Sequence, residues 1–112
     1  MENPSQKPPV SRAVESAFTK AWGDEHVVAL IALKVETSEA DAVAGEVAKF
    51  SEAEDVFLVT GDTDIFLKVR FAHYDGLKEF VLRRLPSVPG IRETKTLLVV
   101  TAYKEGGETA PP

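Results

Sequence analysis

The residues best suited to binding chemistry lie in one short stretch, Thr60-Gly61-Asp62-Thr63-Asp64. Glycine lets the backbone approach another group closely, because it has no side chain to obstruct that group. The two aspartates place carboxylates beside the glycine, and a carboxylate accepts charge-assisted hydrogen bonds from an ammonium group. Backbone N–H groups in such a turn can donate to an anion. The stretch could therefore take part in binding another group, although aspartates also cap ordinary tight turns.

Groups for catalysis or metal binding are scarce. His26 and His73 are the only histidines, and the absence of cysteine excludes disulfides and thiolate metal sites. His26 opens a predicted strand and His73 a predicted helix, which favours surface or capping roles. There is no phosphate-binding glycine loop, dinucleotide-binding motif or G-x-S-x-G nucleophile motif. We therefore expect no enzymatic activity, no metal site and no cofactor.

Composition narrows the partners and the location. The chain has 112 residues, enough for one domain with its own core. Its 18 acidic residues outnumber its 13 basic ones, and the net charge of -5 opposes contact with nucleic acid phosphates. We therefore expect no direct DNA binding. The lack of cysteine and of any apolar run of membrane-spanning length predicts a cytoplasmic protein without a membrane partner.

The turn lies between two predicted strands, within Val56–Phe71. Ile65, Leu67, Val69 and Phe71 alternate with more polar residues, a period of two that is typical of a strand with one buried face. Two runs of strand-forming residues around a short glycine-containing turn predict a β-hairpin.

The remaining segments predict two helices and two further strands. Residues 26–35 and 91–103 carry apolar residues on both strand faces, as in strands covered on both sides. Ser38 followed by Asp41 suggests a capping box for a helix ending near Ser51, and apolar spacing predicts a second helix over 73–85. Residues 1–25 are expected to be a disordered leader with a short amphipathic helix at 11–22, and residues 105–112 a disordered tail. The folded domain is then 26–104.

The resulting order is β-α-β-β-α-β, and its halves resemble each other. Lys34-Val35 recurs as Lys68-Val69 at the corresponding place in the second half. Two such units with right-handed crossovers predict a ferredoxin-like α+β sandwich, with four antiparallel strands and both helices on one face. Because the first and last strands are apolar on both faces, we expect another subunit to cover the open face.

The stretch from Val56 to Val100 resembles the ligand-binding (RAM) domain of the Lrp/AsnC transcription regulators. The resemblance covers about Val27 to Lys104 and rests on motifs in a fixed order. These motifs are Thr60-Gly61-Asp62 with Asp64, Tyr74-Asp75 with Leu77 and Phe80, Pro89-Gly90-Ile91, and Thr94 with Thr96.

The resemblance implies a sandwich that dimerises through its sheet, with dimers that commonly assemble into octamers. It also implies that a small effector, usually an amino acid, binds between dimers near the turn. Thr60, Gly61, Asp62, Asp64, Thr94 and Thr96 are then the expected effector-binding residues.

Family regulators carry an N-terminal helix-turn-helix domain, which residues 1–25 are too short to form. The sequence therefore resembles the stand-alone members, which lack a DNA reader and are expected to work through full-length regulators. A small dimeric α+β-barrel enzyme, of the monooxygenase or isomerase type, is the alternative. Such an enzyme would place His, Asn or Trp in an apolar cavity, whereas the only tryptophan here lies in the leader.

Overall fold

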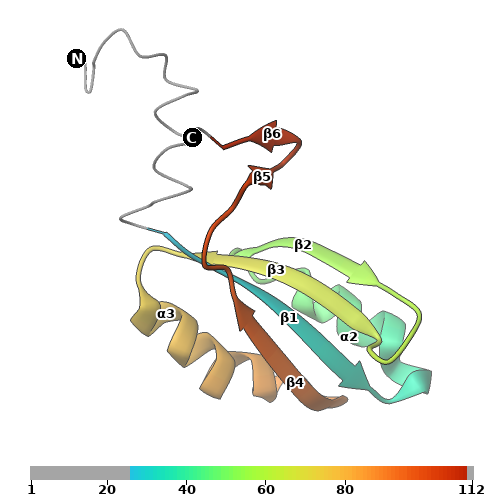
Figure 1. The fold of residues 1–112 in the computed structure, drawn as a ribbon. Coiled ribbons are helices and arrows are strands. Elements are labelled where there is room, and N and C mark those ends of the chain that lie inside the picture. Colours follow the sequence, from blue (N-terminus) through green and yellow to red (C-terminus); the bar gives the residue numbers. More distant parts are fainter. Residues whose placement is uncertain (1–25, 111–112) are drawn as a thin grey trace, which may run out of the picture. The chain divides into compact units, whose positions relative to one another are not determined.

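The computed structural model describes residues 26–110 (Figure 1). The helix expected at 11–22 and the rest of the leader lie outside the described residues. Residues 27–99 form one compact unit, and residues 100–110 belong to a second unit. None of the helices described within residues 26–110 is long and apolar enough to cross a membrane.

Residues 27–99 form a four-stranded antiparallel sheet with two helical segments, in the predicted β-α-β-β-α-β order (Figure 1). The strands lie side by side in the order β2-β3-β1-β4, so the first and third strands are central. The ferredoxin-like α+β sandwich is confirmed. The elements are β1 (Val27–Val35), η1 (Thr37–Glu39), α2 (Ala40–Val47), β2 (Ala53–Leu58), β3 (Ile65–Phe71), α3 (Tyr74–Glu79), η2 (Phe80–Arg84), η3 (Leu85–Ser87) and β4 (Ile91–Leu98).

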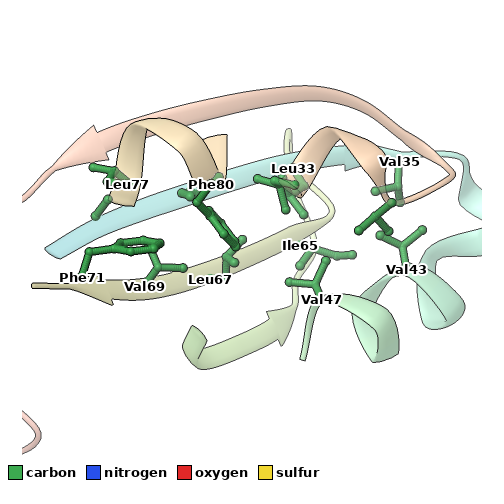
Figure 2. Close-up of a cluster of buried hydrophobic side chains, with 14 residues drawn as sticks. Leu33, Val35, Val43, Val47, Ile65, Leu67, Val69, Phe71, Leu77 and Phe80 are labelled. Carbon is green, nitrogen blue, oxygen red and sulfur yellow. The ribbon is translucent and has the colours of Figure 1, made fainter. Parts of the chain in front are cut away.

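The core lies between the sheet and the helices, and the predicted alternation places it there. Every second residue of β3, from Ile65 to Phe71, is buried, as is every second residue of β1 from Ala29 to Val35. Figure 2 shows side chains from α2 and α3 meeting those from the two central strands. Phe80 is fully buried, and its ring centroid lies 5.0 Å from that of Phe50 and 5.4 Å from that of Phe71.

The internal repeat seen in the sequence has a structural counterpart. Val35 and Val69 are both buried under the helices, whereas Lys34 and Lys68 precede them in the alternating pattern and lie on the other face of the sheet. The repeated lysine-valine pair therefore marks the same position in the two central strands.

The predicted capping box at Ser38 is wrong. Ser38 lies in the 3-10 turn η1, and α2 begins at Ala40 without a side-chain cap. Gly90 packs closely against this start. Its φ is +96°, and a Cβ placed there would lie 2.6 Å from the Glu39 carboxylate oxygen Oε1 and 2.9 Å from Val43. The loop before β4 therefore packs directly on the entry to α2, a contact that local sequence does not encode.

The second helix covers the predicted region but is not a uniform α-helix. After α3 the chain continues as a π-helical segment, η2, and ends in the 3-10 turn η3, where Pro86 lies. Phe80 and Leu85 are five residues apart and both fully buried. Five-residue spacing matches the wider π-helical turn, which lets both side chains reach the core.

The last predicted strand, 91–103, is too long, because β4 ends at Leu98. In the second unit, β5 (Lys104–Glu105) pairs with β6 (Glu108–Thr109) around Gly106-Gly107. The tail expected to be disordered from Glu105 thus contains a short hairpin within its described residues.

Candidate effector-binding site

The turn between β2 and β3 is tied to the end of β1 by several hydrogen bonds. The Thr63 hydroxyl and the Asp64 backbone N–H both donate to the carbonyl oxygen of Leu33, each at 2.9 Å. The Val59 N–H donates to the carbonyl oxygen of Asp64 at 2.9 Å and closes the turn. The turn thus has one defined position relative to the central strand.

Asp64 contributes to this anchoring through its side chain. The Val35 N–H donates to Asp64 Oδ2 at 3.0 Å, in a partly buried position. This carboxylate therefore satisfies a strand-end N–H group, which would otherwise lack a protein partner. The capping role considered for the turn aspartates applies to Asp64, which leaves Asp62 as the more available carboxylate.

Thr60, Gly61 and Asp62 form the exposed part of the turn. Gly61 has a φ of +125°, which L-residues rarely adopt, and a Cβ there would meet nothing within 4 Å. Glycine is therefore needed for backbone conformation and not for packing within this chain. Within residues 26–110, the backbone N–H groups of Gly61, Asp62 and Thr63 donate to no protein acceptor. They remain available to an anion.

The two predicted threonines lie elsewhere in the same chain. Thr94 and Thr96 are on β4, opposite Leu33 and Ile31 of β1. β3 pairs with the other edge of β1, so a whole strand separates the threonines from the turn. Adjacent strands are about 4.8 Å apart, which puts the two groups roughly 10 Å from each other. The threonines and the turn therefore lie at opposite edges of β1.

Lys34 is a candidate that sequence reasoning missed. Its Nζ donates to the carbonyl oxygen of Asp62 at 2.8 Å, so a cation lies directly at the exposed turn. The available signal was the single charged residue near the end of an otherwise apolar strand.

Two other charge clusters, around Glu52 and Glu54, have local partners. Arg84 makes two 2.9 Å hydrogen bonds to Glu52, which lower the pKa of that carboxyl below its ordinary value. Hydrogen bonds from Arg70 likewise lower the pKa of Glu54. His26 and His73 are both exposed, and no group of acidic or histidine side chains among residues 26–110 could hold a metal ion.

The sheet face opposite the helices carries exposed apolar side chains. Leu30 of β1 pairs with Leu97 of β4, and Phe66 of β3 with Phe57 of β2. Directly paired residues share a face, and Leu30 and Phe66 alternate with buried residues, so all four lie on the open face. Leu97 is 48% exposed and Phe57 54% exposed. Such a patch is typical of an interaction surface.

Comparison with known proteins gives the family. The family described as "Lrp/AsnC ligand binding domain" matches residues 28–109. The uncharacterised HTH-type transcriptional regulator PH0140 of Pyrococcus horikoshii is 34% identical over 80 residues, which cover 71% of this chain and 51% of that protein. The HTH-type regulator FL11 of the same organism is 34% identical over 82 residues, covering 73% and 54%. The chain thus spans about half the length of these relatives.

Solved structures agree on the fold. TTHA0845 from Thermus thermophilus superposes with a TM-score of 0.66 at 25% identity, covering 70% of this chain and 99% of that one. A transcriptional regulator from Neisseria meningitidis, NMB0573 in complex with L-Met, gives 0.67 at 24% identity, covering 95% and 65%. These relatives are named as transcriptional regulators and the matched family is a ligand-binding domain, which favours a regulatory domain over the alternative of a small α+β-barrel enzyme. With the family match spanning most of its length, the chain belongs to the Lrp/AsnC family of transcription regulators and carries the ligand-binding domain of that family.

Proposed function

We propose that this domain binds a free amino acid at the turn between β2 and β3 and passes the signal on through protein assembly. The observation that carries the proposal is the anchored turn with its unused N–H groups. The bonds from Thr63 and Asp64 to Leu33 hold the backbone still, while the N–H groups from Gly61 to Thr63 have no acceptor within residues 26–110. A preorganised set of donors loses little entropy when it binds a carboxylate.

The exposed carboxylate of Asp62 completes the recognition of a zwitterion. It can accept from the effector's ammonium group, while the neighbouring N–H groups donate to the effector's carboxylate. Two solved regulators of this fold are described as complexes with L-methionine, which supports an amino acid as the ligand class. An amino acid has few heavy atoms, so we expect affinities in the micromolar to millimolar range.

Assembly supplies what a single chain lacks. Thr94 and Thr96 pair with the buried Leu33 and Ile31, so they lie on the helix side of the sheet and a strand away from the turn; we expect a second copy to present their hydroxyls to the ligand. The open sheet face with Leu30 and Leu97 gives a separate surface on which copies can associate. We therefore propose a homo-oligomer, at least a dimer, with the effector between copies.

We expect at least one L-amino acid to raise the unfolding temperature in a thermal-shift screen of all twenty. A ligand that binds only the native state stabilises it by mass action. Gly61→Val should abolish the shift, because valine disfavours the positive φ. Asp62→Asn should weaken binding at least tenfold by calorimetry, because it removes a charge-assisted hydrogen bond.

Matched variants separate binding from folding. Asp55→Asn changes an exposed aspartate on β2, away from the turn, and should leave the affinity unchanged. Asp64→Ala should lower stability as well as affinity, because it leaves the Val35 N–H without its acceptor. Unchanged affinity in both Gly61→Val and Asp62→Asn would move the site away from this turn.

We further propose that the domain acts on transcription by mixed assembly with full-length Lrp/AsnC regulators. The described residues contain no helix-turn-helix, and the net charge of -5 opposes phosphate. The purified protein should therefore give no sequence-selective gel shift alone. It should change the shift produced by a full-length family member, and the screened amino acid should alter that change. A salt-sensitive, sequence-selective shift with the purified protein alone would contradict this prediction.

A further inference from the structure

The side chain of Lys34 reaches the proposed effector site from the neighbouring strand. Lys34 is exposed and lies between the buried residues Leu33 and Val35, so strand alternation places it on the open face of the sheet. Its Nζ is held 2.8 Å from the carbonyl oxygen of Asp62. The ammonium therefore lies at the same turn whose N–H groups lack acceptors.

The ammonium group of Lys34 has a different partner from that of Lys68, the equivalent lysine in the second half of the repeat. Lys68 occupies the equivalent position on β3 and forms a 3.3 Å ion pair with Glu54. Lys34 donates instead to a neutral carbonyl, and within residues 26–110 it forms no ion pair. An ammonium has three N–H donors, and the Asp62 carbonyl uses one of them. Lys34 thus keeps both its positive charge and further donors for a ligand.

We propose that Lys34 binds the carboxylate of the effector and makes the site selective for amino acids with a free α-carboxylate. This inference rests on the proposed function of the turn. The Lys34 ammonium and the N–H groups of Gly61 and Asp62 would bind the carboxylate of the effector. The Asp62 carboxylate would bind its ammonium group. Lys34 is then a specificity-determining residue, because an uncharged carboxamide accepts a weaker hydrogen bond from the ammonium than a carboxylate does.

The test compares each of the twenty L-amino acids with its α-carboxamide, by thermal shift and then by calorimetry for the pairs that bind. Wild-type protein should bind the acid at least tenfold more tightly than the amide. Lys34→Gln should reduce that preference to less than threefold, mainly because the free amino acid binds more weakly to the variant. Lys34→Arg keeps the charge and should retain most of the preference.

Lys95→Gln is the matched control. Lys95 is an exposed lysine on β4, opposite Ala32, on the same open face as Lys34 but farther along the sheet. The Lys95→Gln variant should leave the acid-to-amide preference unchanged. The unfolding temperature of each variant without ligand, compared with that of the wild type, measures how much the hydrogen bond from Lys34 to Asp62 contributes to stability.

The outcomes separate the two proposals. If the wild type binds an acid and Lys34→Gln keeps the full acid-to-amide preference, the role of Lys34 is overturned and the proposed function stands. The same holds if the wild type binds acid and amide equally. If the wild type binds none of the forty compounds, the proposed function fails, and the role of Lys34 fails with it.

Discussion

Replacing Leu97 by glutamate is expected to convert the protein from a dimer or larger assembly into a monomer. Leu97 lies on the open sheet face beside Leu30, and 48% of its surface is exposed in the single chain. Burying one such side chain contributes roughly 1.5–3 kcal/mol, and in a symmetric dimer each contact occurs twice. A carboxylate in the same place would be desolvated without a partner, which disfavours association strongly.

Light scattering at micromolar concentration measures the result. The wild type should have at least twice the 12.2 kDa chain mass, and Leu97→Glu should have the mass of one chain. Leu82→Glu is the matched control, because Leu82 is 64% exposed but belongs to η2 on the helical side. A monomeric wild type, or an assembly that survives Leu97→Glu, would contradict the proposed use of this face.

Replacing Phe80 by alanine is expected to give the largest loss of stability of any single truncation in this domain. Phe80 is fully buried and contacts the rings of Phe50 and Phe71. Removing a buried phenylalanine costs about 3–5 kcal/mol, because the transfer free energy is lost and a cavity remains. For a domain of this size that is a large part of the total free energy of unfolding.

Denaturant unfolding at a fixed protein concentration measures this loss, since assembly makes stability depend on concentration. Leu82→Ala, on the same helical segment but exposed, should change the free energy of unfolding by less than about 0.5 kcal/mol. If Phe80→Ala lowered the free energy of unfolding by no more than Leu82→Ala does, the buried contacts of Phe80 would not stabilise the domain as we expect.

Part of the proposed site was visible in the sequence. The stretch from Thr60 to Asp64 is an exposed turn between two strands, and its glycine has the positive φ that such a turn allows. These features are local, because a turn is set by a few neighbouring residues. The sequence did not show which of the two aspartates, Asp62 or Asp64, holds the turn in place and which stays exposed. Asp64 accepts from Val35, 29 residues earlier in the chain, and Asp62 is left exposed.

The sequence by itself determined the order of the elements and the buried faces of β3 and of the helices, whereas the first and last strands are apolar on both faces. The alternation from Ile65 to Phe71 and the helical spacing of Leu77 and Phe80 are periodic patterns, and burial of apolar surface requires only that such patterns face one another. The tertiary structure alone decided that Lys34 meets Asp62, 28 residues away, and that β1 separates Thr94 from the turn. Those relations depend on β1 pairing with β3 at one edge and with β4 at the other, and these strands are far apart in the sequence, so no local stretch shows which strands become neighbours.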